Sequence, residues 1–310
     1  MADSAPSMRD RRLLFLLLPV LGVAELVAHR FFAERAPETA EWRELGAPLA
    51  QLAQPGDLVL VAPEWASPIA RHALGERFFP VAAAARADER AFSRAVEISA
   101  LGERSDATRR WRLVSEHDHG RFTLRVLQNP EPELPTYRFL DHVVPESLAV
   151  SVASEGEDTP CSFDARARPL SGGLHGNLAF PSQRFRCGAR ANEFVGLTIA
   201  DDQHYRPRRC IWAHTPVSGA LRLEFRDVPL GRRIRGYAGS SFFLMRDGGA
   251  PVELSVHVEG ERLGHHRHDD ERGFSPYVFE TGQFAGSTRT VRFEVRSAES
   301  REFCFTAEST

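Results

Sequence analysis

A proline-rich segment near the middle of the chain separates two parts with different residue patterns. Residues 129–135 read Asn-Pro-Glu-Pro-Glu-Leu-Pro, three prolines within seven residues. Proline fixes φ and lacks a backbone N–H, so such a run is typical of a linker rather than of a helix or strand. We therefore expect a linker at 130–136 with one domain on each side, which a chain of 310 residues can accommodate.

The part after the linker has the pattern of an all-β domain. Segments such as LAVSVAS, LRLEFRDV, PVELSVHVEG and TVRFEVRS alternate apolar and polar residues, and glycine-rich or aspartate-rich turns separate them. A period of two indicates strands with one buried face. Many short strands with regular turns predict an antiparallel β-sandwich of the jelly-roll type over residues 137–310.

The part before the linker alternates helical and strand patterns. Apolar residues recur at helical spacing over 42–52, and residues 58–62 are apolar at every position, as in a strand covered on both faces. We also expect a strand at 95–99 and a helix at 109–113. This order predicts a small three-layer α/β domain over 37–129, so the whole chain is assigned to the α+β multidomain class.

The N-terminus combines a basic tail with an apolar run. Arginines at positions 9, 11 and 12 precede twelve apolar residues, Leu13 to Ala24, and a less regular apolar stretch continues to Ala33. A helix needs about 20 residues to cross a bilayer. We expect residues 1–12 in the cytoplasm and a signal-anchor transmembrane helix at 13–33. A cleaved signal peptide and a buried N-terminal helix remain alternatives.

All four cysteines lie after the linker: Cys161, Cys187, Cys210 and Cys304. No C-x-x-C motif occurs, which argues against a zinc ribbon or a thioredoxin-like centre. We favour the pairs Cys161–Cys187 and Cys210–Cys304, with four free buried thiols as the alternative. Disulfides persist in oxidising compartments. Together with the N-terminus, they predict a single-pass protein of the bacterial inner membrane that faces the periplasm or exterior.

Charge and motifs restrict the classes of function. The net charge is −3, all 39 basic residues are arginine, and no glycine-rich phosphate loop follows a strand. We therefore expect neither a nucleic acid nor a nucleotide as partner, and lysine chemistry is excluded. The motifs G-x-S-x-G, S-x-x-K and H-E-x-x-H are absent, so a non-catalytic protein is favoured over an enzyme.

Two histidine-rich runs contain candidate metal ligands. Residues 265–271 read His-His-Arg-His-Asp-Asp-Glu and are expected in a loop, where His266, His268 and Asp270 would be the ligands of a transition metal or of a structural calcium. Apart from this calcium we expect no cofactor. Residues 116–119, Glu-His-Asp-His, are expected at a turn. The alternative interpretation of both runs is a solvated polar segment.

Other residues are candidates for contact with a ligand. Aromatic rings with polar neighbours are typical of sugar-binding surfaces. Glu64 and Trp65 directly follow the strand at 58–62, where open α/β sheets bind ligands. The alternative interpretation of every candidate of this kind is that the side chain packs in the core or lies on a solvated face. The candidates after the linker are Trp212, His214, Tyr237, Arg208 and Arg209.

Residues 205–308 resemble galactose-binding-like jelly rolls. CIWAH, DVPLGRRIRGYAG, PVELSVHVEGERLG and VRFEVRSAESREFCF carry the resemblance, which is to the carbohydrate-binding domains found beside some glycosidases (the NPCBM type). It implies a β-sandwich fold and a glycan or cell-envelope polymer as partner. Separately, PGDLVLVAPEWASPIARHALGERFFP followed by AFSRAVEISALGER resembles the soluble α/β domain of membrane-embedded, lipid-dependent glycosyltransferases. That resemblance implies a fold and an envelope setting and transfers no catalytic residue.

Taken together, the sequence predicts a membrane-anchored, extracytoplasmic envelope protein whose β-sandwich binds a glycan without catalysis. One alternative is a metal-dependent hydrolase or glycan-modifying enzyme that uses the 265–271 run. The other is a structural partner in a membrane protein complex.

Overall fold

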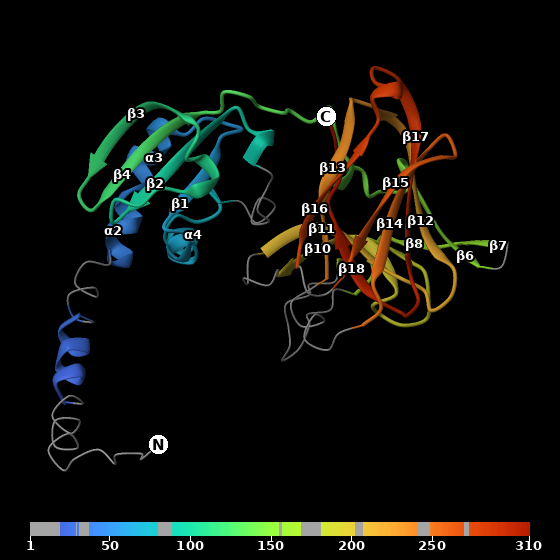
Figure 1. Ribbon diagram of the computed structural model, residues 1–310, viewed down its shortest axis with the longest axis horizontal. Coiled ribbons are helices and arrows are strands. Elements are labelled where there is room, and N and C mark those ends of the chain that lie inside the picture. Colours follow the sequence, from blue (N-terminus) through green and yellow to red (C-terminus); the bar gives the residue numbers. More distant parts are fainter. Residues whose placement is uncertain are drawn as a thin grey trace, which may run out of the picture. The chain divides into compact units, whose positions relative to one another are not determined.

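A computed structural model describes residues 19–28, 30, 37–79, 89–154, 157–168, 181–201, 207–240, 249–269 and 273–310 (Figure 1). The chain forms two compact units. The first contains Met1–Phe78 and Arg94–Pro130, and the second contains Phe79–Ser93 and Glu131–Thr310. Each unit is described by itself below.

The first unit contains a four-stranded mixed sheet in the order β1-β2-β4-β3. Strands β1 and β2 are parallel, and the other two pairs are antiparallel. Trp42 of α2 is buried and contacts the ring of Phe122 on β4, with the centroids 4.6 Å apart. The elements are α2 (Thr39–Glu44), α3 (Gly46–Leu52), β1 (Leu58–Ala62), η1 (Glu64–Ala66), α4 (Ser67–Leu74), β2 (Arg94–Ala100), η4 (Asp106–Thr108), β3 (Arg112–His119) and β4 (Phe122–Gln128).

The strands expected at 58–62 and 95–99 are present as β1 and within β2. The prediction of a helix at 109–113 is wrong. Strand β3 begins at Arg112, and the element before it is a short 3-10 helix, η4. The strand pairing with β4 overrides the local helical preference, since a helix of five residues is unstable without tertiary support.

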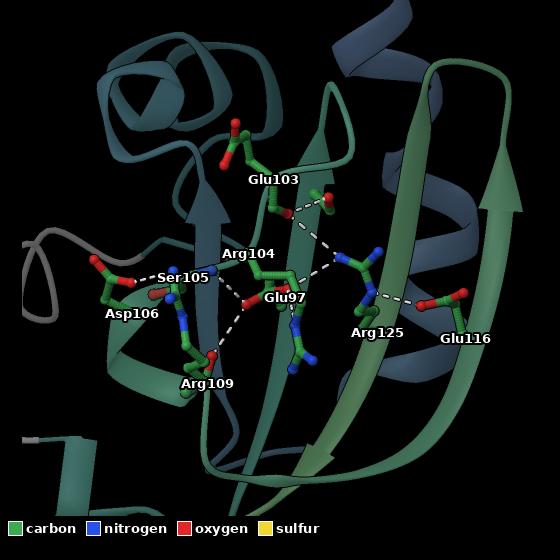
Figure 2. Close-up of polar contacts among 10 residues, drawn as sticks. Glu97, Glu103, Arg104, Ser105, Asp106, Arg109, Glu116 and Arg125 are labelled. Carbon is green, nitrogen blue, oxygen red and sulfur yellow. Dashed lines mark hydrogen bonds and ion pairs between the residues drawn. The ribbon is translucent and has the colours of Figure 1, made fainter.

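A buried carboxylate holds the loop after β2 against the sheet (Figure 2). Glu97 of β2 is fully buried, and its side chain accepts hydrogen bonds from the Ser105 amide at 2.9 Å and the Thr108 hydroxyl at 3.0 Å. Arg125 on β4 donates to the same carboxylate at 3.2 Å and to Glu116 on β3 at 2.5 Å. Because residues alternate across a strand, Glu97 lies on the sheet face opposite the one that Trp42 covers.

The second unit is a β-sandwich, as predicted, with a jelly-roll-like arrangement of two sheets (Figure 1). One sheet has the order β5-β19-β13-β18-β11-β10-β9-β8, with β16 also paired to β13, and the other has the order β15-β14-β17-β12-β6-β7. Alternate residues of both sheets, such as Ile211, Phe305, Leu223 and Phe293, form one shared core.

The bounds of this unit's elements are as follows. They are η3 (Glu89–Ala91), β5 (Tyr137–Arg138), η5 (Phe139–His142), β6 (Leu148–Ser154), β7 (Glu157–Pro160), β8 (Ser162–Asp164), β9 (Arg184–Arg186), β10 (Phe194–Asp201), β11 (Pro207–His214), β12 (Ala220–Pro229), β13 (Arg233–Gly239), β14 (Val252–Val258), β15 (Glu261–His268), β16 (Ser275–Glu280), η7 (Gly282–Phe284), β17 (Thr288–Ser297), β18 (Glu302–Phe305) and β19 (Glu308–Ser309).

Two disulfides are present, Cys161–Cys187 and Cys210–Cys304, in the pairing that the sequence analysis favours. Strand pairing brings the two cysteines of each pair close together. In the β8–β9 pair Ser162 lies opposite Arg186, so the neighbouring Cys161 and Cys187 also lie across from each other, with Cα atoms 4.5 Å apart. Cys210 of β11 and Cys304 of the adjacent strand β18 have Cα atoms 5.6 Å apart.

The prediction of a transmembrane helix at 13–33 is contradicted. Among the described residues, no helix is both long enough and apolar enough to cross a membrane. The helical residues described there are 19–28 and 30, and Glu25 and Arg30 interrupt the apolar sequence. The assignment to a single-pass location in the inner membrane is corrected accordingly, and the membrane as partner is not supported. Residues 1–12, the expected cytoplasmic tail, lie outside the described part.

Candidate functional site

The outer face of the nine-stranded sheet has a second apolar cluster, separate from the main core. On β11, Ile211 and Ala213 belong to the main core, whereas Cys210 and Trp212 point to the other face. The outer cluster includes the second disulfide, and Phe274 packs against it. Its buried members are Phe194, Ala200, Cys210, Trp212 and Cys304.

Trp212 is part of this packing rather than of a binding surface. Its side chain is only 1% exposed, and its ring stacks on Phe194 with the centroids 5.7 Å apart and the planes 17° apart. The indole Nε1–H donates a hydrogen bond to the Asn192 carbonyl at 3.1 Å. The prediction that the Trp212 ring contacts a ligand is therefore corrected, because neighbouring strands and the 181–194 segment bury it.

The hydrogen bond of Trp212 provides a test of this structural role. We expect Trp212→Phe to lower the free energy of unfolding of the β-sandwich by about 1–3 kcal/mol, because it leaves the partly buried Asn192 carbonyl without its indole donor. Denaturant unfolding of the variant measures the loss. Phe163→Leu, a change in a half-buried ring near the other disulfide, serves as a control for a general packing effect. An unchanged unfolding midpoint in Trp212→Phe would contradict the assignment.

His214 is also buried, with 7% of its surface exposed. Its Nε2 lies 2.7 Å from the Ser300 hydroxyl, and burial lowers the pKa of the imidazole. In the β11–β18 register His214 lies opposite Glu302, whose pKa is raised by burial and whose carboxylate accepts a hydrogen bond from Asn192 at 3.0 Å. Because the imidazole is buried and lies beside the Ser300 hydroxyl, the prediction that His214 contacts a ligand is corrected.

Arg208, Tyr237 and Phe274 come together on the same outer face and remain half-buried. We call them the arginine–aromatic cluster. The guanidinium carbon of Arg208 lies 5.2 Å from the centroid of the Tyr237 ring and 5.4 Å from that of Phe274. Both distances are within the range of cation–π contacts. Arg208 and Tyr237, which the sequence analysis lists as candidates, are thus adjacent. Phe274 was not predicted.

Backbone contacts fix the positions of both rings. The Tyr237 amide donates to the Thr306 hydroxyl at 2.9 Å, and the Thr306 amide donates to the Tyr237 carbonyl at 2.8 Å. Gly239 has no side chain, and a Cβ atom there would lie 2.9 Å from the Phe274 Cα atom and ring. The sequence therefore contains only an indirect signal for Phe274. Gly239, two residues after Tyr237, leaves room for an aromatic ring to lie against the sheet.

Arg209 does not join this cluster. Side chains alternate along a strand, so Arg209 and Arg208 lie on opposite faces of β11. Arg209 forms an ion pair with Asp141 at 3.8 Å. The grouping of Arg209 with the ligand-binding residues is therefore corrected.

The histidine-rich run near the C-terminus is a strand and not a loop, because residues 265–268 belong to β15. His266 lies 3.1 Å from the Ser275 hydroxyl, and His268 is 1% exposed beside Phe303. In the described part of the chain no three potential metal ligands are grouped closely enough to hold an ion. Asp270 lies outside the described residues, so the metal or calcium site at His266, His268 and Asp270 stays a prediction.

The candidates in the first unit are placed as follows. Residues 116–119 belong to β3 and not to a turn, and Glu116 and Asp118 there accept hydrogen bonds from Arg125 and Thr123 of β4. Glu64 and Trp65 form the start of η1 directly after β1, and the Trp65 side chain is 59% exposed.

Comparisons with known proteins give weak matches only. No family model and no curated protein matches the chain. Among solved structures, it is similar to the CBM51-2 and INT domains of ZmpB from Clostridium perfringens, with a TM-score of 0.29, 10% identity, and coverage of 52% of this chain and 37% of that one. It is also similar to the CBM51 domain of GH95 from the same organism in complex with methyl-galactose (TM-score 0.25, 10% identity, 37% and 81% coverage).

A third similar structure is Xyl-CBM35 in complex with a disaccharide that contains glucuronic acid, with a TM-score of 0.24, 12% identity, and coverage of 51% of this chain and 94% of that one. TM-scores this low do not by themselves establish a common fold or ligand. The β-sandwich is instead established by the strand pairing above. The resemblance of the first unit to glycosyltransferase domains receives no support from these comparisons.

Proposed function

We propose that the β-sandwich unit is a non-catalytic glycan-binding module and that its ligand contacts the arginine–aromatic cluster. The observation that supports this most is the pair of partly buried rings, Tyr237 and Phe274, beside the guanidinium of Arg208. Aromatic rings pack against the C–H faces of sugars, and arginine offers planar hydrogen-bond donors to their oxygens. A site needs both kinds of group to bind and orient a sugar.

Rigidity of the surface also supports binding. Cys210 lies two residues from Arg208 on the same face, and its disulfide to Cys304 joins β11 to β18, the strand that pairs with β13 of Tyr237. A site that is already ordered loses less conformational entropy when a ligand binds. The two disulfides further favour an oxidising compartment as the place where this module meets its glycan.

Binding to a panel of neutral and acidic oligosaccharides, measured by calorimetry, tests the proposal. We expect wild-type protein to bind at least one glycan, and Tyr237→Ala to weaken that binding about tenfold or more, because it removes one stacking ring. Trp65→Ala is the matched control, since it removes a 59% exposed ring from the other unit and should leave binding unchanged.

Near-ultraviolet circular dichroism checks that Tyr237→Ala retains the wild-type fold. Phe274→Ala provides a second variant of the same surface and should weaken binding to a similar degree. The proposal is wrong if no glycan of the panel binds, or if the folded Tyr237 and Phe274 variants bind as tightly as wild type.

A further inference from the structure

We infer that the outer face of the six-stranded sheet contains an acid-sensitive point, at which protonation of His257 weakens the pairing of β14 with β15. This role is independent of glycan binding. A histidine that lies in register between two arginines becomes a third positive charge when it is protonated. The fold surrounds this charge with cations and little water, so acid favours an opened strand pair in which the charge is hydrated.

His257 lies directly between two arginines on neighbouring strands. On β14 it is opposite Arg262 of β15 on one side and opposite Arg292 of β17 on the other. The residues on either side of His257 in β14 belong to the core, so its side chain points to the outer face of the sheet. Residues that face each other in an antiparallel pair have Cβ atoms about 4.5–5.5 Å apart, and like charges in such positions destabilise the pair.

The two arginines differ in how far their charges are compensated. Arg262 is exposed and donates a hydrogen bond to the Glu253 carboxylate at 2.6 Å. Arg292 is half-buried, and among the described residues it takes part in no ion pair. Its Nε atom is buried without a hydrogen-bond partner. The repulsion that a protonated His257 meets therefore comes mainly from Arg292, because Arg262 is hydrated and paired.

Carboxylates on this face leave the repulsion in place. Glu294 already accepts hydrogen bonds from Arg222 at 3.0 Å and from Arg296 at 2.7 Å. Glu224 lies on the far side of Arg292, one strand away from the imidazole. The other charged and titratable groups that face this side of the sheet are Glu253 of β14, His265 and Arg267 of β15, Arg226 of β12, Asp158 of β7, and Glu259 and Glu261 at the turn between β14 and β15.

The imidazole of His257 has little access to water. Both ring nitrogens are buried, and in the part of the chain that the structure describes neither has a hydrogen-bond partner of normal geometry. Burial lowers the pKa of the imidazole most, and the charge of Arg292 lowers it further. The charge of Glu294 and the Gly260 backbone oppose this shift of the pKa in part. His257 is therefore neutral in the folded protein at neutral pH.

The sign of the pH dependence follows from this shift. Because the pKa of His257 is lower in the folded than in the unfolded protein, the unfolded chain binds more protons below the ordinary histidine pKa of about 6.5. The stability that the neutral imidazole contributes is present above that pH and is lost as the pH falls. Each proton taken up on unfolding lowers the ratio of folded to unfolded protein about tenfold per pH unit.

Denaturant unfolding from neutral to mildly acidic pH tests the role of His257. His257→Gln keeps a polar side chain that cannot be protonated. We expect the ratio of folded to unfolded wild-type protein to fall more steeply below about pH 6.5 than that of the variant, with a difference that approaches one proton. His214, whose pKa burial also lowers, adds to the dependence of both proteins with the same sign, so the comparison removes its contribution.

Two further variants and a local measurement complete the experiment. His265→Gln is the matched control, because it removes an exposed imidazole from the same face of β15, and it should keep the wild-type pH dependence. Arg292→Gln keeps His257 but removes the less compensated of the two flanking charges, so it should reduce the pH dependence in part. Acid should also speed hydrogen exchange of the β14 and β15 amides, after correction for intrinsic rates, in wild type more than in His257→Gln.

The outcomes decide the matter in each case. The role of His257 is wrong if folded His257→Gln retains the wild-type pH dependence, or if His265→Gln loses it. If His257→Gln does not fold, Arg292→Gln provides the test, and an unchanged pH dependence in that variant contradicts the inference. Exchange that rises with acid in β18 of the other sheet but not in β14 and β15 would assign the effect to His214 instead, since His214 lies opposite β18.

Discussion

Removal of the disulfide between Cys210 and Cys304 should lower the free energy of unfolding of the β-sandwich by about 4.7 kcal/mol. The bond closes a segment with a sequence separation of 94 residues, and closing a longer loop removes more entropy from the unfolded chain. Both sulfur-bearing side chains are buried, at 0% and 1% exposure, so the double variant Cys210→Ala, Cys304→Ala introduces no new polar group.

The other disulfide is the matched control. Cys161–Cys187 closes a sequence separation of 26 residues, so Cys161→Ala with Cys187→Ala should lower the unfolding free energy by about 3.5 kcal/mol. Denaturant unfolding of the two double variants measures the difference, which should be about 1 kcal/mol. A larger loss from the shorter loop would contradict the argument from chain entropy. The 210–304 variant should also bind glycan more weakly, because the arginine–aromatic cluster lies beside that bond.

The second large effect is expected at Glu97 in the first unit. Glu97→Ala should lower the free energy of unfolding of this unit by about 3–5 kcal/mol, because it leaves one buried and two partly buried donors without the buried acceptor that they share. Those donors are the Ser105 amide, the Thr108 hydroxyl and the Arg125 guanidinium (Figure 2). Hydrogen exchange of the β2 and β4 backbone amides measures the loss within this unit, independently of the β-sandwich.

Glu103→Ala is the control for Glu97→Ala. Glu103 is exposed, and it accepts hydrogen bonds from Ser99 and Arg125 through its backbone carbonyl, which the substitution keeps (Figure 2). Glu103→Ala should change the free energy of unfolding by less than about 0.5 kcal/mol. If the β2 and β4 amides exchanged at the same rates in the Glu97→Ala and Glu103→Ala variants, the buried Glu97 carboxylate would not be the group that holds the loop after β2.

The site illustrates the limit of inference from sequence. Arg208, Trp212 and His214 share one face of β11, and alternation along the strand alone predicts this. Which of them can meet a ligand depends on what covers that face. Phe194 and Asn192 contact the buried Trp212, and Ser300 contacts His214, whereas Arg208 lies beside two partly buried rings. The covering residues are distant in the sequence, so no local pattern identified them.

Two other expectations failed for related reasons. The histidine-rich run was expected in a loop because it follows a strand expected to end near Leu263 and precedes an aromatic stretch, yet residues 265–268 pair with β14. Backbone hydrogen bonds to a neighbouring strand do not depend on side-chain polarity, so a polar run can form an edge strand. The transmembrane helix was expected from an apolar run that is short for a bilayer, and Glu25 lies within the length that would have to cross.

By itself, the sequence determined the β-sandwich class of the second part and favoured the disulfide pairing that the structure shows. Alternating apolar residues after the proline-rich segment specify strands with one buried face. Tertiary structure alone decided which outward-facing side chains remain accessible and which partners they meet. Periodicity assigns a residue to a face, but exposure on that face depends on contacts between strands far apart in the chain.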